Sequence, residues 1–189
     1  LFMKYAFTTM GCPNWNVDKI ISKAYEYGYS AIDIRGLKGN INTLELPEFT
    51  TLARETAQKF KDNNMPISCF STSISLFNPY NRLKKPLKTR LQEVRKYSEL
   101  SQVFNPDYIR VFGGRIREQN RNDAISEAAM ILDQMGDIAS DYSVSVLFET
   151  HDDWSSSVHV KQVMEQVTSK SVCVLWDVIH TALEMGESP

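Results

Sequence analysis

Two hydrophobic segments of the sequence each end in a carboxylate that a histidine soon follows. Residues 144–149 end in Glu149, with His151 two positions later, and residues 172–177 end in Asp177, with His180 three positions later. An ionised carboxylate at the end of an apolar segment is costly to desolvate unless a cation or hydrogen-bond donors compensate its charge. Oxygen and nitrogen ligands of this kind suit Mn²⁺, Mg²⁺, Zn²⁺ or Fe²⁺. The pattern therefore predicts a divalent-metal site.

Short β-rich segments alternate along the chain with longer amphipathic segments. This alternation is typical of an α/β protein built from βα units with parallel strands. We predict six strands, at residues 4–9, 31–35, 67–72, 108–113, 144–150 and 172–177. Between them we predict five helices, at about residues 17–27, 47–63, 84–104, 121–142 and 157–168. The ends of successive strands lie roughly 26 to 41 residues apart, which indicates a repeating unit.

Repeating βα units form either an open doubly wound sheet or a closed (β/α)8 barrel. An open sheet usually binds its ligand through a glycine-rich first turn, but residues 8–15 contain no G-x-G-x-x-G motif. Polar residues instead stand at or near the ends of four strands, namely Arg35, Arg110, Glu149 and Asp177. Because several strands supply one site at the C-terminal face of a barrel, we predict a single barrel domain over residues 1–189. About six of the eight units are present, so we expect the C-terminal part of the barrel to be missing.

Composition narrows the classes of partner. The formal net charge of −2 argues against nucleic acid as the main partner. No apolar segment approaches the roughly 20 residues that a membrane-spanning helix needs. The three cysteines are far apart and include no C-x-x-C pair, so neither a disulfide framework nor a zinc knuckle is expected. We expect a protein of the reducing cytoplasm.

Five segments, taken together, resemble a known family. They are Thr-Met-Gly-Cys-Pro-Asn-Trp at 9–15, Gly-Tyr-Ser-Ala-Ile-Asp-Ile-Arg at 28–35, Tyr-Ile-Arg-Val-Phe-Gly-Gly at 108–114, Val-Leu-Phe-Glu-Thr-His-Asp-Asp-Trp at 146–154 and Leu-Trp-Asp-Val-Ile-His at 175–180. In this order they resemble the xylose-isomerase-like TIM-barrel superfamily. That group contains sugar phosphate isomerases and epimerases and also endonuclease IV-like proteins.

The resemblance implies a set of metal ligands. In the family a divalent metal is held by a Glu from the fifth strand, an Asp from the sixth, a His from the seventh and a Glu from the eighth. The resemblance therefore assigns Glu149 and Asp177 as ligands, and the other two have no counterpart in this sequence. The family's D-x-x-H pattern matches Asp177 and His180, and that His usually contacts the substrate or a second metal. Many epimerases carry a second Glu six residues after the first, where this chain has Ser155.

Five further side chains are candidates for substrate binding, each with a structural alternative. His180 and His151 lie just beyond strand ends, where a site residue or a local hydrogen bond is expected. Arg110 alternates with apolar neighbours, so its guanidinium needs an anionic partner, which is either the substrate or the carboxylate that ends the fifth strand. Trp15 and Trp154 lie in strand-to-helix loops, where an aromatic ring can line a sugar pocket or pack beneath the loop.

These residues predict an enzyme. The first hypothesis is a metal-dependent isomerase or epimerase of a small sugar, sugar phosphate or related polyhydroxy acid, with Glu149 removing the proton α to a carbonyl. The alternatives are a dehydratase resembling the 3-dehydroshikimate dehydratases, an endonuclease IV-like phosphodiesterase, and a non-catalytic fragment. An incomplete barrel would also expose strand edges, which leaves self-association into a homo-oligomer open.

Overall fold

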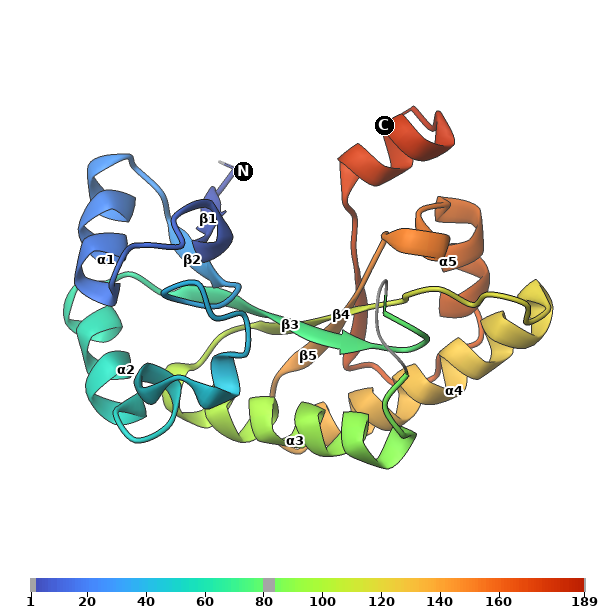
Figure 1. Ribbon diagram of the computed structural model, residues 1–189, viewed down its shortest axis with the longest axis horizontal. Helices are drawn as coiled ribbons and strands as arrows, with labels where there is room; N and C mark the ends of the chain where they lie inside the picture. The colour runs from blue at the N-terminus through green and yellow to red at the C-terminus, as the bar shows by residue number, and fades with distance from the viewer. Residues whose placement is uncertain (1–2, 80–83, 189) are drawn as a thin grey trace. The chain divides into compact units, whose positions relative to one another are not determined.

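The computed structural model describes residues 3–79 and 84–188 and shows strands and helices in strict alternation (Figure 1). In chain order the elements are β1 (Ala6–Thr8), α1 (Val17–Glu26), β2 (Ala31–Ile34), α2 (Ala53–Asp62), β3 (Ile67–Ser75), α3 (Leu87–Phe104), β4 (Tyr108–Phe112), α4 (Arg121–Ser140), β5 (Ser145–Glu149), α5 (Ser157–Met164) and β6 (Val172–Leu175). The six strands form one sheet in the order β1-β2-β3-β4-β5-β6. The pairs β1–β2, β2–β3 and β5–β6 are parallel. The order never reverses, so the doubly wound alternative is excluded.

Contacts within the chain define two compact units. The first unit contains residues 1–73 and 96–109, and the second contains residues 74–95 and 110–189. The assignment of the chain to one domain stays a prediction. Within the described ranges, no helix combines the length and apolar character that a membrane crossing requires.

The core of the first unit is a cluster of aromatic rings. Phe104 contacts Phe49, Phe60 and Phe70, with ring centroids between 5.3 and 6.4 Å apart. Tyr97 packs on Phe70 at 6.0 Å. These rings join α3 to β3 and to the turn that precedes α2, and such pairs add to the stabilisation from burial itself.

The second helix starts later than predicted. We predicted a helix from residue 47, but Pro47–Phe49 form a short 3-10 turn and α2 starts only at Ala53. The cause is Phe49, which is 3% exposed because it packs in the aromatic cluster. The next residue, Thr50, has φ −127° and ψ −95°, which no α-helix tolerates. Burial of one ring therefore overrides the local helical pattern.

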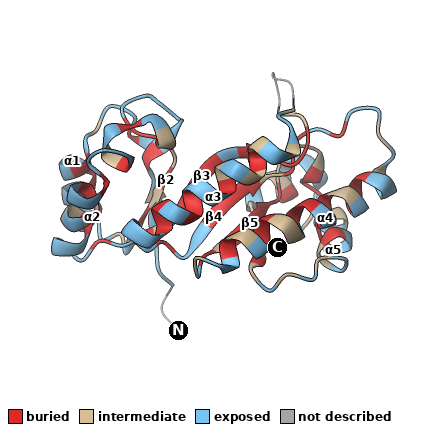
Figure 2. Cartoon of the chain, turned by 90° about the horizontal axis from the view of Figure 1, so that it is seen from below, coloured by how far each residue is buried: buried red, intermediate tan, exposed pale blue. Residues whose placement is uncertain are grey.

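In the second unit, α4 packs on β5 and on α5. The central residues of β4 and all but the first residue of β5 are buried (Figure 2). Beyond β5, Trp154 is fully buried, stacked on Phe77 at 5.5 Å and edge-on to Phe148 at 5.6 Å. This packing fixes the loop after β5, which carries the residues of the candidate site.

We expect Gly113→Ala to destabilise the protein by about 1 to 3 kcal/mol, the usual effect of overpacking a closed core. A Cβ at position 113 would overlap the indole ring of Trp154, which Phe77 and Phe148 hold in place. Gly11→Ala is the matched control, because a Cβ there meets nothing within 4 Å. Urea unfolding of both variants checks the prediction, and equal stability of the two would contradict it.

Candidate functional site

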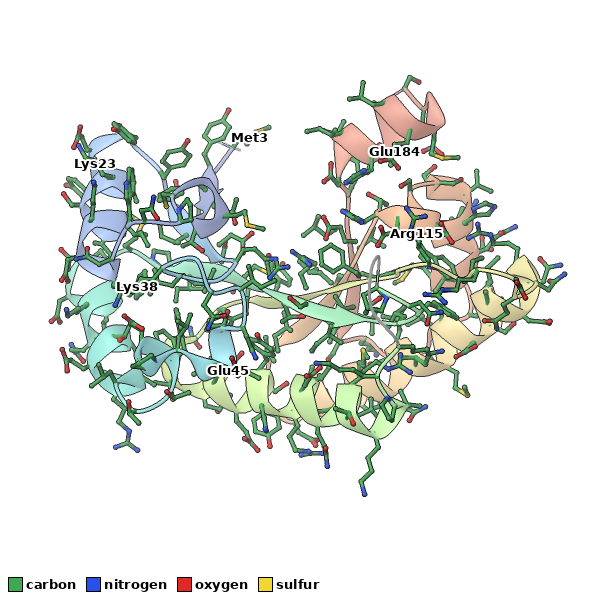
Figure 3. The ribbon with its side chains drawn as sticks, viewed as in Figure 1. Met3, Lys23, Lys38, Glu45, Arg115 and Glu184 are labelled. Atoms are coloured by element: carbon green, nitrogen blue, oxygen red, sulfur yellow. The ribbon has the colours of Figure 1, made fainter. Side chains whose placement is uncertain are left out.

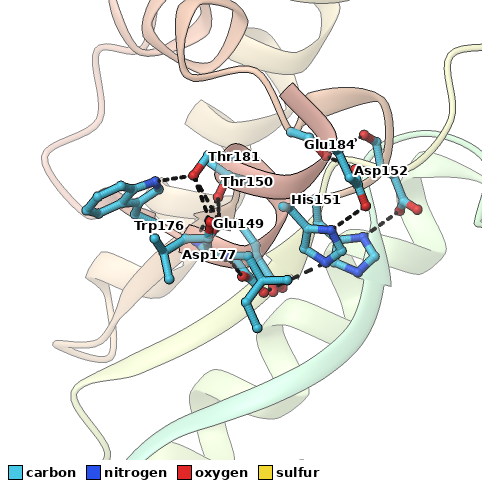
Figure 4. Close-up of polar contacts among 12 residues, drawn as sticks. Glu149, Thr150, His151, Asp152, Trp176, Asp177, Thr181 and Glu184 are labelled. Carbon is cyan, nitrogen blue, oxygen red and sulfur yellow. Dashed lines mark hydrogen bonds and ion pairs between the residues drawn. The ribbon is translucent and has the colours of Figure 1, made fainter. Parts of the chain in front are cut away.

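Glu149 and Asp177 lie at the ends of neighbouring strands. In the β5–β6 register Glu149 stands opposite Leu175, so Asp177 lies two residues beyond the partner of Glu149. We predicted that the sixth strand extends to residue 177, but β6 ends at Leu175. The reason is Thr150, whose hydroxyl accepts the hydrogen bond of the Asp177 backbone N–H at 2.7 Å in place of a strand carbonyl. The close-up in Figure 4 shows the two carboxylates and Thr150 together.

Glu149 forms a buried ion pair with Arg110. Its Oε2 lies 3.0 Å from Nε of Arg110, and the two residues are 8% and 6% exposed. The same oxygen accepts no hydrogen bond of normal angle from any described residue. Burial raises the pKa of Glu149 above its ordinary value, against the opposing charge of Arg110. The guanidinium also lies over the ring of Phe112, 3.7 Å from its centroid. Arg110 was expected to pair with the substrate or with the carboxylate that ends the fifth strand, and in the structure it pairs with that carboxylate.

His180 stands between two carboxylates. It opens a π-helical turn, η5 (His180–Glu184), just after β6. Its Nδ1 lies 2.6 Å from Oε1 of Glu184, and its Nε2 lies 3.8 Å from Oδ2 of Asp177. A metal-free imidazole in this position can donate to one carboxylate and present its other nitrogen to a ligand.

His151 lies against His180, with ring centroids 4.2 Å apart. Its ring also packs on Phe112 at 4.8 Å. Nδ1 of His151 is 3.2 Å from Oδ2 of Asp152, and this carboxylate raises the pKa of His151. The histidine in turn lowers the pKa of Asp152. Five of the predicted residues therefore converge in the second unit, namely Glu149, Asp177, His151, His180 and Arg110.

We expect Asp152→Asn to lower the pKa of His151 toward its ordinary value, because the amide carries no negative charge. In the wild type, the stability from this pair is lost as pH rises through the raised pKa of His151 and as pH falls through the lowered pKa of Asp152. Titration of the histidine ring protons by NMR measures the change. An unaltered pKa of His151 in the variant would contradict the assignment.

The two tryptophans do not join this group. Trp154 has no exposed surface and packs beneath its loop, so the structure gives its ring no face for a ligand. Trp15 belongs to the first unit, where it is half-buried with Nζ of Lys19 over its ring at 5.0 Å. It lines a cavity of about 460 Å³ with Phe7, Cys12 and others. A substrate role for Trp15 stays a prediction.

Three residues that contact this group were not predicted. They are Thr150, which joins the two strand ends, Asp152, which pairs with His151, and Glu184, which pairs with His180. Asp152 directly follows His151, and Glu184 stands four residues after His180, the spacing of neighbours on a helical turn. Helical spacing after the D-x-x-H pattern is the signal that could have identified Glu184.

The donor set fits part of a metal shell. The buried Oε2 of Glu149 has no hydrogen-bond partner among the described residues and pairs only electrostatically with Arg110, and Asp177 adds a second carboxylate close enough to raise the pKa of Glu149. Across residues 3–79 and 84–188, however, no three histidine, cysteine or carboxylate side chains lie close enough to hold one ion. The described residues therefore offer two oxygen donors, and a complete shell for a divalent ion needs more ligands.

Comparison with known proteins gives one family match. The family model described as "Xylose isomerase-like TIM barrel" matches residues 21–189. Among curated proteins, no sequence match is found.

Solved structures share the fold at low sequence identity. The probable 3-DHS dehydratase AsbF of Bacillus anthracis has TM-score 0.76 and 17% identity over 94% of this chain. The IOLI protein with a bound zinc atom has TM-score 0.75 and 19% identity over 94% of this chain. This chain covers 64% of the length of each of these two structures. D-psicose 3-epimerase of Clostridium cellulolyticum H10, solved with D-tagatose, has TM-score 0.74 and 12% identity, with 98% of this chain and 67% of that chain covered.

Proposed function

Because the chain belongs to the xylose isomerase-like TIM-barrel family, we propose that it is a divalent-metal-dependent isomerase or epimerase of a small sugar, sugar phosphate or related polyhydroxy acid. The observation that carries the proposal is the buried Glu149, which lies beside Asp177 at the ends of two adjacent strands. A carboxylate held in a buried site next to a substrate carbonyl is suited to removing a proton from the carbon α to that carbonyl. Glu149 is the base in this proposal.

The other residues of the site orient the base and the substrate. Arg110 holds Glu149 in one orientation through the ion pair and through its own packing on Phe112. His180 and His151 contact substrate hydroxyl groups. Glu149 and Asp177 would hold the metal, and a bound ion would polarise the substrate carbonyl and so favour loss of the adjacent proton. Sugar epimerases among the structural neighbours support this choice of reaction class.

A dehydratase is the second candidate. It is favoured by the structural similarity to the probable 3-DHS dehydratase. Loss of water from a hydroxy ketone also begins with removal of a proton next to the carbonyl, so Glu149 would be the base in this reaction too.

Product analysis distinguishes the two candidates. The protein is incubated with Mn²⁺ or Mg²⁺ and, separately, with D-fructose, D-tagatose, D-psicose and 3-dehydroshikimate. An isomerase or epimerase gives a product of unchanged mass from a ketose, and chelation of the metal stops the reaction. A product lighter by one water from 3-dehydroshikimate alone would replace the first proposal with the second. Conversion of none of these compounds would count against both.

A further inference from the structure

Two glutamates of the segment after β6 accept hydrogen bonds from the end of the β5–α5 loop and from the first residue of α5. Glu184 accepts a hydrogen bond from the Ser155 hydroxyl at 2.7 Å. Glu187 accepts from the backbone N–H of Ser157 at 3.0 Å, which caps the first turn of α5, where Ser156 makes no side-chain cap. Figure 3 labels Glu184 on this C-terminal segment. The two carboxylates thus have similar anchoring roles, but they differ in one contact.

Only Glu184 reaches the histidine. One of its oxygens lies 2.6 Å from Nδ1 of His180, and the other accepts the Ser155 hydroxyl. Ser155 is 2% exposed, so this second bond fixes the carboxylate from a buried point. A glutamate at position 155 would place a second negative charge next to the carboxylate of Glu184, and the two like charges would repel. Ser155 instead donates a hydrogen bond to Glu184, the last residue of η5.

The contact determines which nitrogen of His180 carries the proton. A carboxylate only accepts hydrogen bonds, so a neutral imidazole must donate from Nδ1 to Glu184 at 2.6 Å. Asp177 could instead favour a proton on Nε2, but its Oδ2 lies 3.8 Å from that nitrogen, beyond hydrogen-bond distance. We propose that Glu184 is a positioning residue, which holds His180 as the Nδ1–H tautomer and leaves Nε2 as a hydrogen-bond acceptor.

An acceptor at Nε2 selects for a hydroxyl donor. Resting on the proposed function, this assigns His180 to accept a hydrogen bond from a substrate hydroxyl beside Asp177, rather than to donate one to a carbonyl or phosphate oxygen. A carboxylate behind an imidazole fixes ring orientation and tautomer in the same way in other enzymes. The substrate class that fits is one with a hydroxyl group near the reacting carbonyl.

Nitrogen-15 NMR of the imidazole rings tests the positioning without any substrate. The chain has three histidines, so His151→Gln and His159→Gln assign the His180 signals by elimination. Spectra are recorded at alkaline pH, at which ordinary imidazoles are neutral. In the wild type we expect Nδ1 of His180 to be protonated and Nε2 to be unprotonated. Glu184→Ala removes the carboxylate beside Nδ1 and leaves Asp177, which lies on the Nε2 side of the ring. We therefore expect the proton to move to Nε2 in this variant.

Glu187→Ala is the matched control, because it removes the other carboxylate anchor of the same segment without touching His180. It should leave the Nδ1–H tautomer unchanged, and Glu184→Met, of similar side-chain length, should behave like Glu184→Ala. A wild-type His180 protonated at Nε2, or an Nδ1–H tautomer that survives in both Glu184 variants, would overturn the proposal. Because the readout needs no turnover, failure of the proposed function would leave this result standing.

Discussion

Replacing Glu149 with glutamine is expected to reduce the turnover of whichever substrate the protein converts by about 10²- to 10⁴-fold, the usual contribution of a general base. The amide keeps the size of the side chain but cannot take up a proton. It also removes one of the two carboxylates that would bind the metal. We therefore expect metal affinity, measured by titration calorimetry, to fall together with the rate.

The matched control is Glu127→Gln. Glu127 is another glutamate in an ion pair, 2.8 Å from Nζ of Lys84, and it belongs to α4 rather than to the site. Its variant should retain turnover close to that of the wild type. If Glu149→Gln folds, as judged by circular dichroism, and still turns over the substrate as fast as the Glu127→Gln protein, then Glu149 is not the base.

Arg110→Met is expected to lower the free energy of unfolding by about 3 to 5 kcal/mol, the effect of removing one partner of a buried ion pair. The variant leaves the carboxylate of Glu149 buried without its cation, which raises the pKa of Glu149 further. A carboxyl group with a raised pKa in the folded state destabilises the fold as it ionises. The variant should therefore lose stability as pH rises through that raised pKa.

Two further variants make this prediction specific. Arg110→Met combined with Glu149→Met removes both charges, and we expect it to recover most of the lost stability because apolar residues of similar volume replace a buried pair without large penalty. Arg95→Met alters an exposed arginine and should change stability by less than about 0.5 kcal/mol. Urea unfolding at several pH values measures the stability of all three variants. A double variant as unstable as Arg110→Met alone would contradict the ion-pair account.

The order of the strands and helices could be predicted from the sequence because strand-like and helix-like segments alternate regularly along it. All six predicted strands exist, since each is a short apolar segment bounded by turn residues, and their chain-order pairing follows from βα repetition. The start of α2 could not be predicted, because Phe49 leaves the helical path to join rings that are distant in sequence. Local periodicity contains no information on such contacts.

The site could be predicted in part for the same reason. Glu149 ends β5 and Asp177 lies just beyond β6, and parallel strands bring their ends together, so the proximity of the two carboxylates follows from topology. The partner of His180, Glu184, lies on the turn η5 beyond the last predicted strand, so the signal for it was its spacing of four residues from His180, which the prediction did not use. For Trp154 the sequence left a pocket wall and packing beneath the loop both open, and in the structure its ring packs between Phe77 and Phe148.

Exchange of the substrate proton α to the carbonyl with solvent tests the central claim most directly, because exchange reports removal of this proton even when no new product accumulates. The protein is incubated in D₂O with Mn²⁺ and each of D-fructose, D-tagatose and D-psicose, and the loss of the proton signal is followed by NMR. We expect at least one ketose to exchange this proton for deuterium with the wild type and not with Glu149→Gln. A wild-type protein that leaves this proton in place in every ketose, or a Glu149→Gln variant that exchanges it at the wild-type rate, would contradict the assignment of Glu149 as the proton-transfer base of a sugar isomerase or epimerase.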